Sequence, residues 1–523
     1  MKILTVAQMT EVDRLSTEQY GFPGILLMEN AGMHCFRVLQ EEFSVDLAEL
    51  RIVLVCGKGN NGGDGMVLAR QLLQHGIPSR VFLLGRLTEL QGGAAVNASI
   101  LSHSGQSIHE VVDESQMAAL EHALEACDIA VDALLGTGLS KPLVGRYARA
   151  VEAINRSPGF RLAVDIPSGM CADSVTSCGL SVWADRTVTF TAPKIAHILS
   201  EAGERLGQLD IVPIGSPAAL LDREDYFLEL IDEQKAADSL IARSLNSHKG
   251  SYGHLLVLAG SRGKSGAAAM AARAALRSGV GLVTLAVPRG IQSEVAVSSP
   301  EVMTEGLAED ELGAFDSAAW EEVKALLEGK TALALGPGLS LQPGAAGLVR
   351  QVVEESQLPV VLDAGAVDAL RDHLELLNQC QASLILTPHP GEFSRLTGTS
   401  PSEIASRRID VARDFAGKYG VWLVLKGFRT ILADPRGKVR VCPLGNPGMA
   451  TAGMGDVLTG VIGALLAGHA AQGSGQGALA AASAGLYVHS LAGDLAASEV
   501  GMDGMLARDV IDCLPEAMAQ LRD

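Results

Sequence analysis

The feature that most constrains the fold is a unit that recurs along the chain: an apolar run, a glycine-rich loop and then a helical pattern. The run RIVLVC at 51–56 is followed by GKGNNGGDG, and the apolar residues of MVLARQLLQHG then have helical spacing. DIAVDALLG at 128–136 and RLAVDIPSG at 161–169 repeat the strand and loop. Apolar strands that alternate with helices are typical of parallel sheets covered on both faces. We therefore predict an α/β fold with a doubly wound sheet, whose ligands bind at the carboxyl ends of the strands.

The series is interrupted in the middle of the chain. Residues 216–250 include the charged stretch LLDREDYFLELIDEQKAAD, which lacks a clear strand–helix unit, and the turn-rich stretch SLNSHKGSYG. Strand and loop units then resume at HLLVLAGS. We expect a domain boundary near 225–240, between a domain of residues 1–225 and a domain of residues 235–523.

Composition and charge exclude several classes of protein. Hydrophobic residues make up 48% of the chain and charged residues 19%, with 58 glycines, which suits a soluble α/β protein and not a disordered one. The net charge of −19 argues against non-specific binding to nucleic acid or to an anionic membrane. We find neither a signal-peptide pattern nor a run of about 18 apolar residues. We expect a cytoplasmic protein with no nucleic-acid or membrane partner.

The cysteines predict no cross-links. There are eight, no pair has C-x-x-C spacing, and several lie in apolar runs such as VLVCG and RVCPLG. Buried free thiols in a reducing compartment explain them better than disulfides or zinc ligands do.

The second half of the chain contains a glycine turn at GNPGMATAGMGDVLTG, residues 445–460. We expect its glycines at 445, 448, 453 and 455 to adopt positive φ, and a helix to follow Asp456. Free N–H groups and the positive dipole end at a helix N-terminus favour a phosphate. A carboxylate at such a place suits metal binding or acceptance of a hydroxyl proton. An ordinary N-cap aspartate is the alternative.

The first glycine loop is a less specific signal. Gly57, Gly59 and Gly62 form G-x-G-x-x-G after a strand, but the next strand ends without an acidic residue to bind a ribose. Asn60, Asn61 and Asp64 in a tight loop suit oxygen coordination of a cation or contacts to a polar ligand. An Asx-rich turn is the alternative.

Two further carboxylates, Asp132 and Asp165, end strand runs in VDALLGTG and VDIPSG. A carboxylate at the end of a buried strand is costly unless it is paired, metal-bound or functional. Structural N-caps are the alternative. Lys141, in the loop after Asp132, could contact a phosphate, although a solvated lysine is the commoner case.

Other polar residues of the second half lie in loops that follow strands. GSRGKSG at 260–266 is not a P-loop, because position 258 is leucine where glycine is required. Two prolines and a glycine in TPHPGE hold His389 in a stiff turn, which suits either a ligand contact or a hydrogen-bonded surface histidine. Lys426 enters a glycine loop in VLKGFRT, where it could bind a nucleotide phosphate.

These motifs in this order resemble two enzyme families. LMENAG, GNNGGDG, VDALLGTGL and VDIPSG in residues 1–215 resemble the NAD(P)H-hydrate epimerases. HKGSYGHLLVLAGS, GPGL, LTPHPGEF, LKGFRT and GNPGMATAGMGDVLTG in residues 240–520 resemble the ADP-dependent NAD(P)H-hydrate dehydratases. The resemblance implies a Rossmann-like first domain and a ribokinase-like α/β/α second domain. Ala452 departs from the pattern, since many relatives have glycine there.

The resemblance also implies the reactions and the site residues. The first domain would convert the R and S hydrates of NADH and NADPH into each other, and the second would dehydrate the S form with ADP and Mg²⁺. Hydrate contacts in the first domain match Asn60, Asn61, Gly62, Gly63, Asp64, Gly136, Thr137, Gly138, Leu139, Ser140, Lys141, Pro142 and Asp165, and K⁺ ligands match Asn61, Asp132 and Ser168. In the second domain, hydrate contacts match Ala267, Gly338, His389 and Asp456, and nucleotide contacts match Lys426, Gly427, Phe428, Arg429, Thr430 and Gly455.

Asp165 and Asp456 are the expected acid/base residues of the two domains, and we expect a homotetramer or a larger homo-oligomer. Two other functions remain open from the residues. One is a ribokinase-class kinase that phosphorylates a vitamin or sugar alcohol with ATP, but this function leaves GNNGGDG and VDIPSG unexplained. The other is a nucleotide-binding interaction module without catalysis, against which the polar residues at many strand ends argue.

Overall fold

The computed structural model describes residues 1–475 and 477–522 and divides into two compact units, Met1–Tyr226 and Phe227–Asp523. Each unit has its own parallel sheet and its own apolar core. Both units are therefore α/β, as the recurring strand and helix pattern predicts.

The first unit contains a seven-stranded sheet in the order β3-β2-β1-β4-β5-β6-β7, with every pair parallel. The strands are β1 Ile52–Cys56, β2 Ser79–Leu83, β3 Ile108–Glu110, β4 Ile129–Ala133, β5 Phe160–Val164, β6 Arg186–Phe190 and β7 Gln208–Val212. The helices are α1 Val6–Glu18, α2 Gly24–Phe43, α3 Asn60–Gln74, α4 Gly92–His103, α5 Glu114–Glu125, α6 Gly145–Arg156 and α7 Ile195–Leu199.

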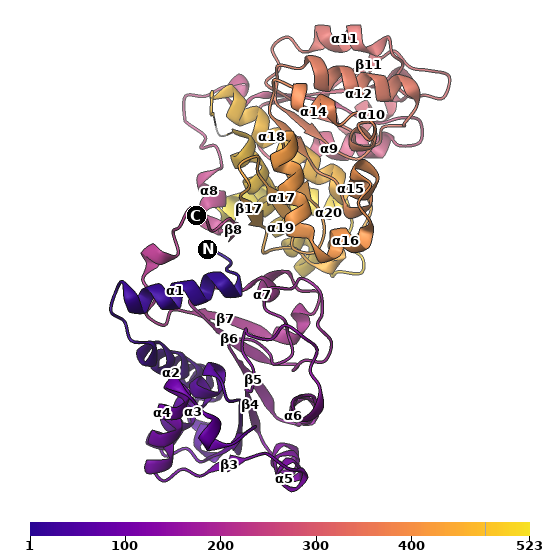
Figure 1. Ribbon diagram of the computed structural model, residues 1–523. Coiled ribbons are helices and arrows are strands. Elements are labelled where there is room, and N and C mark those ends of the chain that lie inside the picture. The colour runs from indigo at the N-terminus through magenta and orange to yellow at the C-terminus, as the bar shows by residue number, and fades with distance from the viewer. Residues whose placement is uncertain (476, 523) are drawn as a thin grey trace. The chain divides into compact units, whose positions relative to one another are not determined.

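Helices cover both faces of this sheet (Figure 1). Alternate residues of β1 point to opposite faces: Ile52 and Leu54 pack in a core with α2, α3 and α4, whereas Val53 and Val55 pack in a core with α5 and α6. This alternation explains why the strand is an unbroken apolar run. The strand order reverses between β1 and β4, so the loops after these two strands flank the crevice where doubly wound sheets bind ligands.

The second unit contains a ten-stranded sheet in the order β11-β10-β9-β12-β13-β14-β15-β16-β17-β8. The strands are β8 Leu228–Leu230, β9 His254–Leu258, β10 Leu282–Pro288, β11 Met303–Leu307, β12 Ala332–Leu335, β13 Val360–Leu362, β14 Leu384–Leu386, β15 Trp422–Leu425, β16 Ile431–Ala433 and β17 Val439–Val441. The helices are α8 Glu233–Asp238, α9 Ser265–Arg277, α10 Gln292–Ser298, α11 Ala319–Leu326, α12 Pro343–Glu355, α13 Gly365–Asp368, α14 Glu375–Gln379, α15 Pro390–Thr397, α16 Pro401–Ser406, α17 Arg408–Tyr419, α18 Met454–Ala471, α19 Gly477–Val500 and α20 Ala507–Gln520.

The strand order of this sheet reverses between β9 and β12, so the loops after these strands define its crevice. Only β16 runs antiparallel to its neighbours, and it forms a hairpin with β17. The segment near the expected boundary is more ordered than its charge pattern indicates. Its strand β8 pairs with β17, so the residues between the two expected domains begin the second unit.

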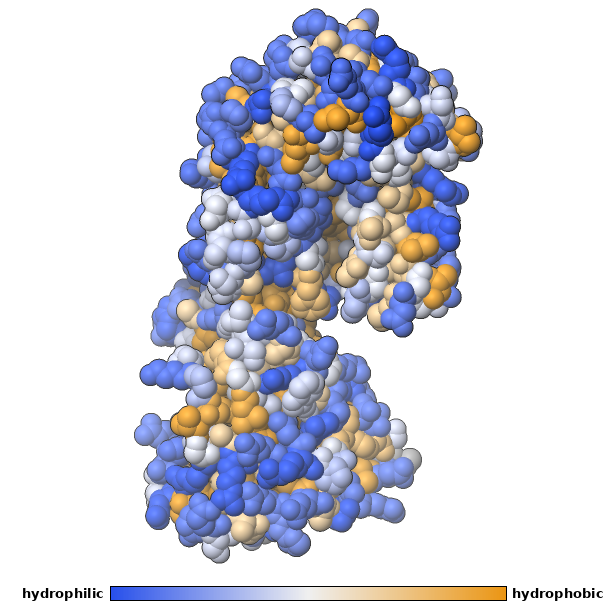
Figure 2. All heavy atoms as spheres, turned by 90° about the vertical axis from the view of Figure 1, so that its right-hand side faces the viewer, coloured by the Kyte–Doolittle hydropathy of each residue, from blue (hydrophilic) through white to orange (hydrophobic). Residues whose placement is uncertain are grey.

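Helix α18 forms the centre of the second unit's core. It is long and apolar enough to cross a membrane by length and composition, but most of it is buried inside the unit. It packs against α9, whose alanines 268, 271, 272, 274 and 275 are fully buried. Hydrophilic residues cover most of the face shown in Figure 2, so the apolar composition is concentrated in such interior elements.

One expectation about the cysteines is wrong. A disulfide joins Cys171 and Cys178, whose Cα atoms lie 6.0 Å apart in the loop after β5, within the usual range for a disulfide. A search for C-x-x-C spacing cannot find a pair separated by seven positions. The cysteines that the structure describes as free are 35, 56, 127, 380, 442 and 513, and all but Cys380 are buried.

Candidate active sites

The first candidate site is built at the start of α3. The helix begins at Asn60, with Gly59 as its N-cap, so Asn60 to Asp64 lie in the helix and not in a loop as expected. Close packing accounts for the glycines here: a Cβ on Gly62 would lie 1.9 Å from the carbonyl oxygen of Gly57. Asn60 is exposed, whereas Asn61 and Asp64 are buried. The helix thus carries two polar side chains into the crevice of the sheet.

Asp132 and Ser168 form one side of this crevice. Asp132 is fully buried inside β4 and is not an N-cap. Its carboxylate accepts hydrogen bonds from the Ser168 backbone N–H at 2.7 Å and hydroxyl at 2.6 Å. Burial raises the pKa of Asp132 to about 6, against the effect of these hydrogen bonds.

The side chain of Asn61 joins this group. Its amide nitrogen and oxygen are both buried without a hydrogen-bond partner among the described residues. A Cβ on Gly136 would lie 3.4 Å from the Cβ of Asn61 and 3.5 Å from Oδ2 of Asp165. The loops after β4 and β5 therefore converge on the start of α3, which brings together the residues expected at this site. Farther along the loop after β4, Lys141 is exposed.

Asp165 lies at the end of β5 with a positive φ of 65°. Its Oδ1 accepts hydrogen bonds from Lys194 Nζ at 2.8 Å and from Thr189 Oγ1 at 3.0 Å. Lys194 is only 2% exposed, so a buried ion pair lies directly in the crevice. Burial alone would raise the pKa of Asp165, but the charge of Lys194 and its hydrogen bonds hold this pKa below its ordinary value.

The pKa values of two other carboxyl groups near this ion pair are shifted in the opposite direction. Burial raises the pKa of Asp64 well above its ordinary value, and the negative charges of Asp165 and Asp13 raise it further. Burial also raises the pKa of Asp13, on α1, to about 6, and Oδ1 of Asp13 is buried without a partner among the described atoms. The crevice therefore combines one ionised carboxylate, Asp165, with carboxyl groups that retain protons more readily.

The second candidate site is a cavity of about 560 Å³ at the crevice of the second sheet. The expected contacts Ala267, Gly338 and Asp456 all line it. Its other lining residues come from the loops after β9, β12 and β13 and from α9, α13 and α15: Gly263, Lys264, Gly266, Met270, Leu339, Leu341, Ala364, Gly365, Asp368 and Glu392.

Helix α18 begins at this cavity, three residues earlier than expected. Gly453 is its N-cap with a φ of 93°, so Asp456 is the third helical residue and not an N-cap. The structure gives no hydrogen-bond partner to the backbone N–H groups of residues 454–456 within the chain it describes. Positive φ occurs at Gly445 and Gly453 but not at Gly448 or Gly455, where lack of space explains the glycine.

Asp456 has an unusual electrostatic environment. Its pKa is raised to about 7. Burial and the negative charges of Asp363 and Glu392 raise this pKa, and the positive charge of Lys426 acts against them. A carboxyl group with a pKa near 7 is suited to proton transfer at neutral pH. Asp456 therefore combines the position and the acidity of a general base.

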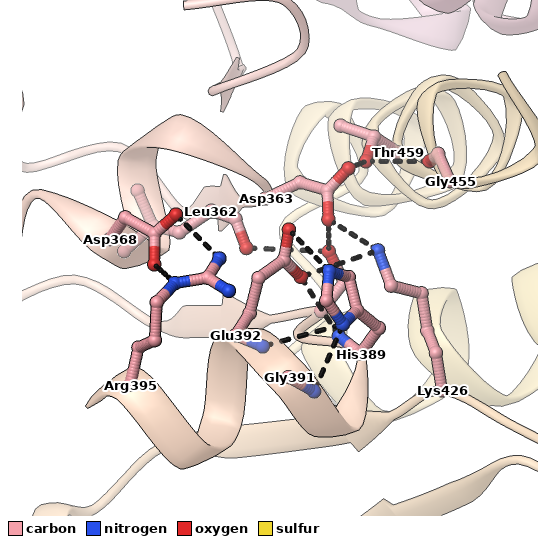
Figure 3. A network of polar contacts seen from close by, with 11 residues as sticks. Leu362, Asp363, Asp368, His389, Gly391, Glu392, Arg395, Lys426, Gly455 and Thr459 are labelled. Atoms are coloured by element: carbon pink, nitrogen blue, oxygen red, sulfur yellow. Dashed lines mark hydrogen bonds and ion pairs between the residues drawn. The ribbon is translucent and has the colours of Figure 1, made fainter. Parts of the chain in front are cut away.

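Lys426 belongs to a charged network with Asp363 and Glu392 (Figure 3). Its Nζ lies 2.7 Å from Oδ1 of Asp363 and 4.0 Å from Oε2 of Glu392. The expectation of a lysine available to a phosphate is thus incomplete, because two carboxylates already neutralise Lys426. An incoming phosphate would share or replace these partners.

His389 is the N-cap of α15, and its side chain is half-exposed. Its Nδ1 accepts hydrogen bonds from the backbone N–H groups of Gly391 at 3.0 Å and Glu392 at 3.3 Å. The ring is thereby fixed, and its Nε2 lies 3.4 Å from Oε1 of Glu392. His389 is a capping histidine at the edge of the network, so the surface alternative and a ligand contact are both compatible with its position.

The loop of residues 427–430 is held by Arg408. Its guanidinium donates to the carbonyl oxygens of Phe428 at 2.6 Å and Arg429 at 3.4 Å. Gly427 and Arg429 both have positive φ, and the Phe428 ring is exposed. The loop starts at Lys426, next to the cavity, but its own residues do not line the cavity.

Comparisons with known proteins decide the family. Residues 255–516 match the profile of a family described as NAD(P)H-hydrate dehydratase, and residues 25–196 match the profile described as YjeF-related protein N-terminus. The whole chain is 40% identical to a bifunctional NAD(P)H-hydrate repair enzyme of Moorella thermoacetica, of which it covers 98%. The chain belongs to the family of bifunctional NAD(P)H-hydrate repair enzymes.

Other relatives agree with this family. A bifunctional NAD(P)H-hydrate repair enzyme of Escherichia coli is 34% identical, with 96% of this chain and 91% of that protein covered. A crystal structure of an ADP/ATP-dependent NAD(P)H-hydrate dehydratase from Bacillus subtilis, co-crystallized with ATP/Mg2+, is 30% identical, with a TM-score of 0.48, and the match covers 56% of this chain and 98% of that one. The expected α/β fold is confirmed, and the second unit matches the NAD(P)H-hydrate dehydratase profile.

Several residues at both sites of this repair-enzyme chain were not expected from the sequence. In the first unit these are Asp13, Thr189, Lys194 and His197, and in the second they are Asp363, Thr387, Glu392 and Thr459. A signal for Asp363 was present, since it follows the apolar run LPVVL as Asp165 follows RLAV. Lys194 comes four residues after β6, and no motif marks it.

Proposed function

We propose that this chain repairs hydrated NADH and NADPH, with the first unit exchanging the R and S hydrates and the second dehydrating the S form with ADP. The observation that carries the proposal is the placement of Asp456, a carboxyl group with a pKa of about 7, among free helix N–H groups at a 560 Å³ cavity. The two family matches in one chain support the pairing of the activities.

In the second unit, Asp456 acts as the general base. It accepts the proton of the substrate hydroxyl while the hydroxyl oxygen attacks the β-phosphoryl group of ADP, and AMP leaves. The N–H groups at the start of α18 stabilise the charge that develops on the transferred phosphoryl group. Phosphate then departs, driven by the lone pair of the ring nitrogen, and loss of a ring proton restores the double bond. The products are NAD(P)H, AMP and phosphate.

The substrates would divide the site between them. Ala267, Gly338 and His389 would contact the hydrate, and residues 426–430 with Gly455 would contact the nucleotide. No cluster of three His, Cys, Asp or Glu side chains suited to a metal ion occurs in residues 1–475 and 477–522. Mg²⁺ would arrive bound to the nucleotide, at the cavity that Glu392 lines, and would neutralise phosphate charge.

In the first unit, Asp165 is the proposed base and Asp64 the proton donor. Asp64 would protonate the hydroxyl group, which leaves as water when the ring nitrogen supplies its electron pair. Water would then add to the opposite face of the ring and lose its proton to Asp165. The low pKa of Asp165 and the raised pKa of Asp64 support these complementary roles. Residues 60–64 at the start of α3 and the loop of residues 136–142 would hold the hydrate.

The donors present at the start of α3 fit a potassium ion. Asn61 has a buried amide oxygen without a partner, and an ion would satisfy it. Asp132 in β4 and Ser168 in the loop after β5, which are hydrogen-bonded to each other, would complete the protein ligands. A bound ion would supply positive charge beside the substrate-binding loops.

The function is tested with a mixture of R and S hydrates, ADP and Mg²⁺, by following absorbance at the reduced-nicotinamide band. Recovery of all the hydrate as NAD(P)H is the expected result, because exchange feeds the R form to the dehydratase. Recovery that stops at the S fraction would remove the proposed epimerase activity. A stable phosphorylated alcohol as the end product would instead support the kinase alternative.

The pH dependence of dehydration should follow Asp456. Because the base must be ionised, and because the pKa of Asp456 is raised to about 7, kcat/KM should fall about tenfold per pH unit below 7. Above this pH the carboxylate is fully formed and this dependence disappears. Initial rates with S hydrate between pH 5.5 and 9 measure this decline, which is the acid limb of the pH profile. A kcat/KM that stays constant down to pH 5.5 would contradict the assignment of Asp456 as the base.

A further inference from the structure

Asp363 is a buried carboxylate that the proposed reaction does not yet use. It follows β13 directly and is only 1% exposed. It lies beside the first turn of α18, because a Cβ on Gly455 would lie 3.6 Å from its Oδ2 and 3.0 Å from Nζ of Lys426. It does not line the cavity, so a direct contact with substrate is not its role.

Both oxygens of Asp363 have partners from different elements (Figure 3). Oδ1 lies 2.7 Å from Nζ of Lys426 and accepts a hydrogen bond from Thr387 Oγ1 at 2.8 Å. Oδ2 accepts a hydrogen bond from Thr459 Oγ1 at 2.9 Å. Asp363 thus connects the ends of β14 and β15 to the second turn of α18.

We propose that Asp363 is a positioning residue for the dehydration reaction, which fixes Lys426 and the start of α18 so that Asp456 and the free N–H groups face the cavity. The proposal rests on the proposed function of the second unit. Thr459 is one helical turn after Gly455, and its hydroxyl lies 3.0 Å from the carbonyl oxygen of Gly455. By fixing Thr459, Asp363 therefore also fixes the first turn of α18. A buried carboxylate needs such partners, since an unpaired one is strongly unfavourable.

The charge of Asp363 also acts on Asp456. The groups whose charges reach Asp456 are Asp363, Glu392 and Lys426. The other polar groups nearby are His389, which pairs with Glu392, His489, whose pKa the charge of Lys426 lowers, and Lys264 at the cavity. The charge of Asp363 raises the pKa of Asp456. Asp363 also forms an ion pair with Lys426, whose positive charge lowers the pKa of Asp456. Without the Asp363 charge, Lys426 remains and the carboxylate form of Asp456 becomes easier to reach.

The test is Asp363→Asn in the full chain, assayed with S hydrate, ADP and Mg²⁺ from pH 5.5 to 9. We expect kcat at pH 8.5 to fall about 10- to 100-fold, as for a displacement of reacting groups on the order of 1 Å. The acid limb of kcat/KM should move to lower pH, because the charge that raises the pKa of Asp456 is removed. A merely structural loss would lower activity with the folded fraction and leave the limb in place.

Asp434→Asn is the matched control, because Asp434 is also a buried carboxylate of this unit and pairs with Arg440 at 3.1 Å in a hairpin turn. It should leave both kcat and the limb unchanged. Thr459→Val, which keeps the Asp363 charge, is the second variant if Asp363→Asn does not fold. It should lower kcat about tenfold without moving the limb.

Three outcomes are decisive. A wild-type chain without ADP-dependent dehydration removes the proposed function itself. A wild-type limb near 7 that Asp363→Asn does not shift overturns only the role of Asp363. Full activity in Thr459→Val overturns the proposal that Asp363 positions the start of α18 through Thr459.

Discussion

Asp456→Asn is expected to lower ADP-dependent dehydration of the S hydrate by about 10²-fold or more, the usual scale for loss of a general base. Asparagine keeps the size of the side chain but cannot accept the hydroxyl proton. Exchange of R and S hydrates by the same protein should be unchanged, because that reaction belongs to the first unit. Turnover within a few fold of wild type would remove Asp456 from the role of base.

The same variant should be more stable than the wild type at high pH. The pKa of Asp456 is raised from 3.8 to about 7 in the folded chain, so the folded state binds the proton more tightly than the unfolded state does. Stability from this group is present below pH 3.8 and is lost as pH rises through 7, at most about 4 kcal/mol. Thermal melts should show Asp456→Asn above wild type at pH 8, with a smaller gap at pH 5.

Asp509→Asn provides the matched control for this variant. Asp509 is also the third residue of a helix in the second unit, and its Oδ2 accepts a hydrogen bond from the Leu506 backbone N–H at 2.8 Å. Asp509 therefore caps the start of its helix through this hydrogen bond, a role that Asp456 does not have. Its replacement should leave dehydration intact and destabilise the chain by about 0.3–1 kcal/mol, because asparagine keeps a hydrogen-bond acceptor but loses the negative charge near the helix N-terminus. Opposite changes in stability are therefore expected for two aspartates at the same helical position.

The strand pattern predicts most of this architecture because parallel strands are buried on both faces and leave a strong apolar signal. The first and last residues of helices and strands are harder to predict from the sequence pattern. The start of α3 at Asn60 was missed because glycines normally argue against a helix, whereas here Gly62 and Gly65 let the helix approach β1 and β4. The strand β8 was missed because it is an edge strand of three residues in a charged segment.

The expected site residues and the missed ones differ in a physical way. Asp132, Asp165 and Asp456 follow apolar runs or glycines, so their unusual surroundings are visible in the local sequence. Lys194 is important only because the fold places its Nζ 2.8 Å from Asp165, 29 positions earlier. Asp363 and Lys426 meet across 63 positions in the same way. A partner brought by the tertiary fold leaves no local pattern.

Asp165→Asn is expected to lower exchange of the R and S hydrates by about 10²-fold or more, because the amide cannot take a proton from water. Dehydration of pure S hydrate serves as the internal control and should be unchanged. Asp128→Asn is the external control, since this aspartate stands at the amino end of β4, pairs with exposed Arg51 at 2.8 Å and lies away from the crevice. Exchange at the wild-type rate in Asp165→Asn would remove this residue from the role.

Loss of Asp165 also leaves Lys194 buried without its anion, which typically costs about 3–5 kcal/mol and could unfold the first unit. The double variant Asp165→Asn with Lys194→Met separates the two effects, because replacing both members of a buried ion pair by neutral groups is often close to neutral for stability. We expect the double variant to regain the thermal stability of the first unit and to remain without exchange. If exchange returned together with the stability, Asp165 would be a partner for Lys194 and nothing more.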